Sequence, residues 1–527
     1  MSRWRRVGRL LIPGMLAVAV VFYRFPTTER MHWEELSHYL GAVQRVLDGQ
    51  ALVTQVKFMF APAQISLITW WMGTAGYNLG ALAWFFVIGW YLYLLLFGVV
   101  VCQCSRNLAL AAVICVIFAS LWLVDGYDIL NSWGGPRYVP GILMLALFNQ
   151  LSFSEKAVEF DATIHGIAGF FLPLSFSASP EQVTIVVFAW VAARLITRDW
   201  SSVQGPTTST LIASRSTPFI LGSLLGIALL LPGHRFSTLV QYLVELPSYS
   251  SWRQPITEHA RVLATIAVLL TIPGFAVLIL YARRHQRQRF SATERAIVTF
   301  GIFAALQFVY ALRAFQYSQG VMATGFILVL MSCILQQAWK AKELRPIVGS
   351  VAMFYAVCSV LLRSEARAEF ASHASANFSG VAVHCSTGCR ESRWPRLSGV
   401  LLPVRDADAL DALLTGVRNG WRESRDSTFL VFPEDAFLEF ALNRSGESRF
   451  PIAAVAATTA EWRKEIFDSV VARPPSIVVR RTQLGLFARS IGSRSELLPE
   501  LGGFILNNYS VVATAGSFEV LTRTHVR

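Results

Sequence analysis

Two adjacent carboxylates and two imidazoles lie close together in the segment that follows the first apolar run. These side chains belong to Glu34, Glu35, His32 and His38. A carboxylate within hydrogen-bond reach of a hydroxyl group can remove its proton as a general base. The pattern therefore indicates acid–base chemistry in this loop. The alternative interpretation is that Glu34 or Glu35 only begins a helix over residues 36–47, where the helix dipole favours an acidic side chain.

A second group of ionisable side chains lies where apolar runs begin or end. Its members are Arg137, Glu181, Arg235, Arg253 and Arg313. A guanidinium group binds phosphate through two parallel hydrogen bonds, so these arginines are suited to holding a phosphate. Ionisable groups at a membrane boundary are costly unless they are solvated or paired, and their presence indicates a polar cavity. Arg137 and Arg313 are equally compatible with side chains that extend to the membrane surface. Glu181 is compatible with a charge that only favours a helix start.

The composition places these residues in an integral membrane protein. The chain has 527 residues, of which 54% are hydrophobic and 15% charged, and its mean hydropathy is +0.48. A soluble protein averages ~25% charged residues, and several apolar runs here approach the ~20 residues that cross a bilayer core. The net charge of +13 does not indicate a nucleic-acid partner, because the arginines lie between apolar runs and not along one soluble face.

The pattern of apolar runs predicts about eleven transmembrane helices with the N-terminus in the cytoplasm. The first span follows the N-terminal arginines and shows no cleavage site of a signal peptide, and residues 62–75 are expected to form a re-entrant or interfacial helix. The basic loops, above all 283–289, then fall on the cytoplasmic side, as the positive-inside rule requires. Both groups of candidate residues fall on the outer face. The other ten runs lie near 80–102, 107–124, 137–150, 162–177, 182–197, 217–232, 260–282, 296–312, 321–338 and 346–363.

The C-terminal part differs from the rest because strand-like and helix-like segments alternate in a polar background. This alternation predicts a small α/β domain over residues 364–527. An odd number of spans places it outside the cytoplasm, with residues 1–363 forming the membrane domain. There Cys385 and Cys389 are expected to form a local disulfide, since a zinc site would need two further ligands nearby.

Several short motifs occur in an order that resembles the glycosyltransferase C superfamily, which are polytopic enzymes of the protein O-mannosyltransferase and aminoarabinose transferase kind. An acidic outer loop, 26–62, follows the first span, many spans come next, and an outer α/β domain ends the chain. The motifs are His32-Trp33-Glu34-Glu35 with Tyr39, Leu47-Asp48-Gly49, Phe60-Ala61-Pro62, Ser179-Pro180-Glu181, Val431-Phe432-Pro433-Glu434-Asp435 and Pro474-Pro475-Ser476-Ile477-Val478-Val479.

The resemblance implies an inverting transfer of a sugar from a polyprenyl-phosphate donor, within the plasma (inner) membrane, to an acceptor on its outer face. It implies that Glu34 or Glu35 is the base, and that a divalent metal, Mg²⁺ or Mn²⁺, assists the reaction as in some relatives. The partners are then the lipid-linked donor, membrane lipid and an acceptor that the sequence does not identify. The residues expected to bind substrate are His32, His38, Arg137, Glu181, Arg235, Arg253 and Arg313.

The chain also departs from the superfamily pattern, which keeps two other function classes open. The family's first-loop acid is usually aspartate, no second acid occurs at 54–56, and the late Arg-x-Asp-x-x-His element is reduced to residues 313–318. A non-catalytic membrane scaffold would explain these losses. A transporter or lipid flippase would instead need broken or charged helices in corresponding halves, and no half-repeat is present.

Overall fold

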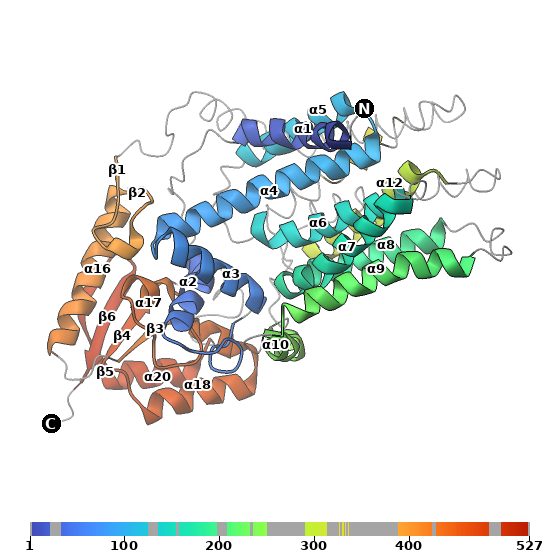
Figure 1. Ribbon diagram of the computed structural model, residues 1–527. Coiled ribbons are helices and arrows are strands. Elements are labelled where there is room, and N and C mark those ends of the chain that lie inside the picture. The colour runs from blue at the N-terminus through green and yellow to red at the C-terminus, as the bar shows by residue number, and fades with distance from the viewer. Residues whose placement is uncertain are drawn as a thin grey trace.

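The computed structural model places a helical bundle beside a smaller region of helices and strands (Figure 1). It describes residues 3–21, 33–58, 60–124, 135–153, 158–197, 208–231, 235–249, 290–312, 388–423, 428–483 and 497–524, with six positions between 326 and 336. The predicted runs at 260–282 and 346–363, and most of 321–338, lie outside these residues. The predicted fold class, mainly helical with a C-terminal α/β region, is confirmed.

The bundle consists of long apolar helices that approach one another through small residues. Its core contains Phe97, Phe118, Phe148 and Phe300. A side chain on Gly98 would come within 2.4 Å of the Gly14 backbone, and small residues that allow this approach are typical of helix pairs in membranes. The helices are α1 (Arg3–Val21), α4 (Leu79–Ser105), α5 (Leu108–Val124), α6 (Gly135–Phe153), α7 (Val158–Ala178), α8 (Pro180–Ile196), α9 (Thr208–Ala228) and α12 (Ala292–Leu312).

One helix in the described part of the chain is long and apolar enough to cross a membrane on its own. This helix is α4, with 27 residues and a mean hydropathy of 2.4 in its most apolar window. Shorter apolar segments lie at Leu10–Ala19, Leu108–Ala119, Ala162–Ala178 and Ser216–Ala228. The predicted count of eleven spans therefore stays a prediction.

The C-terminal region is built on a four-stranded sheet in the order β3-β4-β6-β5. Strands β3 (Phe429–Phe432) and β4 (Ile477–Arg481) are parallel, whereas β5 (Tyr509–Ala515) and β6 (Phe518–Arg523) complete the sheet with antiparallel pairings. The helices of this region are α16 (Val404–Glu423), α17 (Phe437–Ala441), α18 (Ala460–Ala472) and α20 (Pro499–Asn508), with short 3₁₀ turns η5 (Pro395–Leu397) and η6 (Ala453–Thr458).

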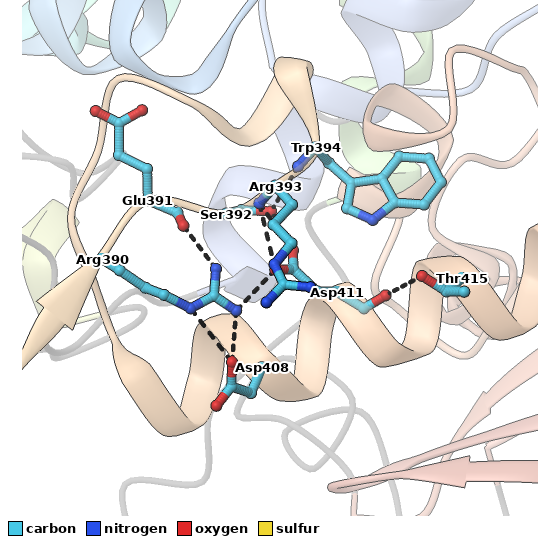
Figure 2. Close-up of polar contacts among 8 residues, drawn as sticks. All are labelled: Arg390, Glu391, Ser392, Arg393, Trp394, Asp408, Asp411 and Thr415. Atoms are coloured by element: carbon cyan, nitrogen blue, oxygen red, sulfur yellow. Dashed lines mark hydrogen bonds and ion pairs between the residues drawn. The ribbon is translucent and has the colours of Figure 1, made fainter.

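A small two-stranded sheet and a polar cluster stabilise the segment that precedes α16. Strand β1 (Cys389–Arg390) pairs with β2 (Leu402–Pro403), and Cys389 is disulfide-bonded to a cysteine outside the described residues. Figure 2 shows the Asp411 carboxylate facing this segment. It accepts hydrogen bonds from Arg390 Nη2 at 2.7 Å and from Ser392 Oγ at 2.6 Å. These contacts hold the segment on α16.

The same segment continues onto the N-terminal end of α4. Gly80 N donates to the Ser398 carbonyl at 3.0 Å, and the Gly80 and Gly399 backbones are so close that a Cβ on Gly80 would lie 2.8 Å from Gly399 Cα. Gly399 has φ +80, a conformation that favours glycine. The C-terminal region is therefore seated directly on the longest apolar helix.

Three short helices lie between the bundle and the sheet: α2 (Trp33–Leu47), α3 (Pro62–Ala75) and α10 (Arg235–Tyr249). Leu36, Tyr39 and Leu40 of α2 share one core with Phe437 and Val479 of the C-terminal region. The segment after the first apolar run thus packs with residues about 400 positions later.

A buried ion pair fixes α2 to α17. Arg45 donates to Glu439 through Nε at 2.8 Å and Nη2 at 2.6 Å, and the two side chains are 1% and 2% exposed. Arg45 Nη1 also donates to the Ser448 carbonyl. Burial raises the pKa of Glu439 and the Arg45 charge opposes this rise. The Arg45 charge therefore opposes protonation of the buried Glu439 carboxyl group.

We predict that removing one partner of this pair destabilises the protein more than removing both. Arg45→Met leaves a buried carboxylate without its cation and should cost about 3–5 kcal/mol of unfolding free energy, whereas Arg45→Met with Glu439→Met should recover most of that loss. Thermal unfolding of the purified variants measures both values. An unchanged Tm for Arg45→Met would show that the pair does not support the fold.

Candidate active site

An aromatic group connects α2 with the segment that precedes α3. His38 meets the Phe60 ring edge-on with centroids 5.6 Å apart, and Tyr39 stacks on the same ring at 5.1 Å. The Tyr39 ring also lies 5.3 Å from Phe86 of α4. His38 and Tyr39 are buried, so the first-loop helix is anchored at this end of the bundle.

Arg137 also contacts the Phe60 ring. Its guanidinium carbon is 5.4 Å from the Phe60 centroid, in the range of a cation–π contact. Arg137 donates from Nε to Glu181 at 3.0 Å and from Nη2 to the Tyr310 hydroxyl at 2.6 Å. The start of α6, the start of α8 and the end of α12 therefore meet beside the first loop. On the predicted topology, all three helix ends belong to the outer face.

A second polar layer lies one helical turn further into the bundle. Gln307, one turn before Tyr310, donates to the Gln182 side chain, and both are buried. A Cβ on Gly141, one turn after Arg137, would lie 3.0 Å from Gln182 Cβ, so the absence of a side chain there lets α6 and α8 approach. The Gln182 Nε2 and Ser179 Oγ atoms are buried and have no hydrogen-bond partner among the described residues. Buried polar atoms of this kind are suited to a polar ligand.

Burial decides the charge of His38. It lowers the pKa of this imidazole from its usual 6.5 to about 3, because a charged ring would lose its hydration. His38 is therefore neutral near pH 7. A neutral imidazole can donate or accept a hydrogen bond, which fits the predicted role in binding and not a role as a proton donor.

The structure brings some of the predicted site residues together and not others. His38 and Arg137 contact Phe60, and Glu181 pairs with Arg137. Arg235 is the exposed first residue of α10. Three others lie outside the described residues: His32, Arg253 and Arg313.

For the candidate bases Glu34 and Glu35, the structure describes the backbone and not the side chains. Glu34 and Glu35 belong to the first turn of α2, and their side chains lie outside the described part. Residues four apart share a helix face, so Glu34 is in register with His38 and Glu35 with Tyr39. Both neighbours contact Phe60, so the register leaves both acids as candidates.

Sequence reasoning did not select Tyr310, Gln182 or Gln307 for the site. Tyr310 precedes Arg313 at the end of a predicted apolar run, where a tyrosine is usual at a membrane interface. The glutamines are polar residues inside apolar runs, which is a signal of interior function that was available in the sequence.

An apolar pocket of about 540 Å³ opens between α7, α8 and α9. Its lining includes Phe176, Val183, Val187 and Phe188. Val183 belongs to the first turn of α8, the helix that also carries Glu181. A chain of hydrocarbon units would fit such a lining.

The described residues contain no group of three His, Cys, Asp or Glu side chains that could hold a metal ion. The side chains of Glu34, Glu35 and His32 lie outside the described part of the chain. The expected divalent metal therefore stays a prediction.

No protein-family model matches the sequence, and no curated protein matches it. Among solved structures, the chain is similar to ArnT from Cupriavidus metallidurans bound to undecaprenyl phosphate. The TM-score is 0.51 at 12% identity, and the alignment covers 100% of this chain and 99% of ArnT. The chain has the ArnT fold. The predicted resemblance is thereby confirmed for the fold alone.

Two further structures are similar to a lesser degree. The apo state of the same ArnT has a TM-score of 0.49 at 12% identity, over 99% of this chain and 98% of that one. The oligosaccharyltransferase AglB from Archaeoglobus fulgidus, in complex with an inhibitory peptide and a dolichol-phosphate, has a TM-score of 0.47 at 12% identity, over 99% of this chain and 75% of AglB.

We predict that the buried His38 makes the protein acid-sensitive. Its folded-state pKa lies below its unfolded value, so the unfolded chain binds a proton that the folded chain does not bind. Stability should therefore fall by up to about 1.4 kcal/mol per pH unit as the pH drops below about 6.5, until it reaches about 3. Denaturant unfolding of wild type and His38→Gln between pH 7 and pH 4 measures the effect. Parallel pH profiles for the two proteins would contradict it.

Proposed function

We propose that this protein is a membrane glycosyltransferase that moves a sugar from a polyprenyl-phosphate donor to an acceptor on the outer face of the membrane. The observation that carries the proposal is the cluster in which the first-loop residue Phe60 meets Arg137, and Arg137 pairs with Glu181 at the start of α8. The same helix α8 also lines an apolar pocket. The ArnT fold supports the proposal, because that similarity extends over both whole chains and the ArnT structure holds undecaprenyl phosphate.

Arg137 is proposed to bind the donor phosphate. A guanidinium presents five N–H donors in a rigid plane, and the contacts to Glu181 and Tyr310 fix the direction of that plane. The polyprenyl chain would occupy the pocket between α7, α8 and α9. Arg235, Arg253 and Arg313 remain proposed phosphate or headgroup contacts, and His32 and His38 remain proposed substrate contacts.

Glu34 or Glu35 is proposed to act as the general base. The carboxylate would take the proton of the acceptor hydroxyl while the hydroxyl oxygen attacks the sugar C1. The bond between C1 and the phosphate oxygen breaks with its electron pair on the phosphate, so polyprenyl phosphate leaves and the configuration at C1 inverts. A divalent metal, Mg²⁺ or Mn²⁺, would stabilise the charge that develops on the departing phosphate.

The proposal includes the orientation of the chain. The N-terminus is placed in the cytoplasm and residues 364–527 outside it, as a second domain after the membrane domain 1–363. The disulfide at Cys389 supports this placement, because disulfides persist in oxidising compartments. The common location of Arg137, Glu181 and Tyr310 supports a topology in which α6 and α8 run in one direction and α12 runs in the opposite direction.

The test is sugar transfer in proteoliposomes supplied with a panel of polyprenyl-phosphate sugars, followed by the release of polyprenyl phosphate. Loss of a general base typically lowers a rate by 10²–10⁴-fold. The double variant Glu34→Gln with Glu35→Gln should therefore lose roughly 100-fold or more in kcat, and one single variant should account for most of the loss.

The matched control is Glu461→Gln, which changes an exposed first-turn glutamate on α18. It should keep wild-type activity. Full activity of the folded double variant would remove both acids from the mechanism. A wild type that binds polyprenyl phosphate but transfers no sugar would favour the scaffold alternative, and movement of the lipid across the bilayer would favour the flippase.

A further inference from the structure

Two buried glutamines of different helices form a hydrogen-bonded pair inside the bundle. Gln307 of α12 donates from Nε2 to Gln182 Oε1 of α8, and the two residues are 6% and 1% exposed. Val183 follows Gln182 and Phe303 lies one turn before Gln307, and both belong to the apolar core. Two leucines would fill a similar space without removing two amides from water. Packing alone therefore does not explain the pair.

The hydrogen bonding of this pair is also incomplete. An amide nitrogen has two N–H groups to donate. Gln182 Nε2 is buried, and it has no hydrogen-bond partner among the described residues. A buried donor in this state lowers the stability of a fold. A role other than stability is therefore needed to account for the two glutamines.

The pair and Gly141 form a layer that uses the same three helices as the ion-pair cluster around Arg137. Helices α6, α8 and α12 contact one another, and each contributes one residue to either layer. The matched positions are Arg137 and Gly141 on α6, Glu181 and Gln182 on α8, and Tyr310 and Gln307 on α12. A shift of any of these helices in the glutamine layer therefore moves a member of the Arg137 cluster.

The glutamine pair constrains how α8 and α12 slide along each other. A slide of one residue moves a helix by about 1.5 Å. Arg137 bonds to Glu181 of α8 at 3.0 Å and to Tyr310 of α12 at 2.6 Å, so a slide of that size would break one of these bonds. A hydrogen bond between buried polar side chains specifies one register, as a buried asparagine does in a coiled coil.

Gly141 sets the spacing between α6 and α8. A Cβ on Gly141 would lie 3.0 Å from Gln182 Cβ, which is closer than an ordinary van der Waals contact. A side chain at this position would push α6 away from α8, and so move Arg137 away from Glu181. The glycine thus controls the spacing of the helices, and the glutamine pair controls their register.

We propose that Gln182, Gln307 and Gly141 are positioning residues that hold the Arg137 guanidinium in the orientation that binds the phosphate of a lipid. The inference rests on the proposed function in one respect, which is that Arg137 binds this phosphate. The positioning residues act through α6, α8 and α12 and do not touch the lipid. Without them Arg137 keeps its charge but loses the fixed direction of its planar fork, on which bidentate binding of phosphate depends.

The test measures the Kd of the purified full-length protein for undecaprenyl phosphate, together with its Tm. Gln182→Leu with Gln307→Leu removes the pair at similar volume. This double variant should bind at least about fivefold more weakly, while its Tm stays close to that of wild type or rises, because no buried amide is left unpaired. Gly141→Ala keeps every polar group and should also weaken binding.

The matched control is Gln103→Leu, which removes another buried glutamine of the same bundle. Gln103 lies near the end of α4, and its Nε2 donates to the Ala146 carbonyl of α6 at 3.0 Å. This variant should bind undecaprenyl phosphate as wild type does. An equal loss of affinity in the control would contradict the proposal, because any buried amide of the bundle would then have the same effect.

A second background shows whether the glutamine pair acts through Arg137. Arg137→Lys lacks the planar fork, so there is no guanidinium left to orient. In that background the two leucine substitutions should weaken binding by less than about twofold, because effects that share one route are not additive. Equal fold-losses in both backgrounds would show that the pair acts independently of Arg137 and would overturn the proposal.

Two other results would also contradict it. Wild-type affinity of the double leucine variant would show that the pair has no effect on the phosphate site. A large fall in its Tm would show that the pair supports the fold as a whole. If the wild type itself showed no saturable binding, the proposed function would fail and this inference with it, whereas the other results contradict the inference alone.

Discussion

The buried ion pair between Arg45 and Glu439 joins residues 394 positions apart and sets the geometry on which the candidate site depends. Taking both charges out of water is costly, and the cost is offset only when each charge meets its partner with good geometry. Arg45 lies near the C-terminal end of α2, and the two acids lie in the first turn of the same helix. Fixing one end of a helix of 15 residues constrains the other end. The C-terminal region therefore helps to determine where the candidate bases lie.

The bundle fixes the other side of the candidate site. Tyr39 and His38 rest on Phe60, Phe60 lies under Arg137, and Arg137 is oriented by Glu181 and Tyr310. Three helix ends and one loop thus share a single cluster. In the proposed reaction, the base lies in the first turn of α2 and the phosphate-binding Arg137 lies on α6. The cluster fixes the position of one relative to the other. The polyprenyl chain of the donor would lie in the apolar pocket between α7, α8 and α9.

The sequence predicted the local elements better than the contacts between them. The run near 80–102 became α4, and the expected helix at 62–75 became α3, because apolar residues at a regular spacing report burial directly. His38, Arg137 and Glu181 were expected in one site, and the structure brings them together, although their roles stay predictions. The partner of Arg45 was not predictable, because 394 residues separate it from Glu439 and either charge alone is compatible with a solvated loop. The Gln182–Gln307 contact depends in the same way on how α8 packs against α12.

The most direct measurement of the central claim is the affinity of the purified protein for undecaprenyl phosphate, compared between wild type and Arg137→Lys. A lysine keeps the charge but lacks the planar fork that binds phosphate bidentately and pairs with Glu181 and Tyr310. The account predicts saturable binding by wild type and a Kd at least about tenfold weaker for Arg137→Lys, equal to about 1.4 kcal/mol. Arg473→Lys, at an exposed position after α18, should bind as wild type does. Equal affinity of wild type and folded Arg137→Lys would contradict the assignment of this cluster as the phosphate site.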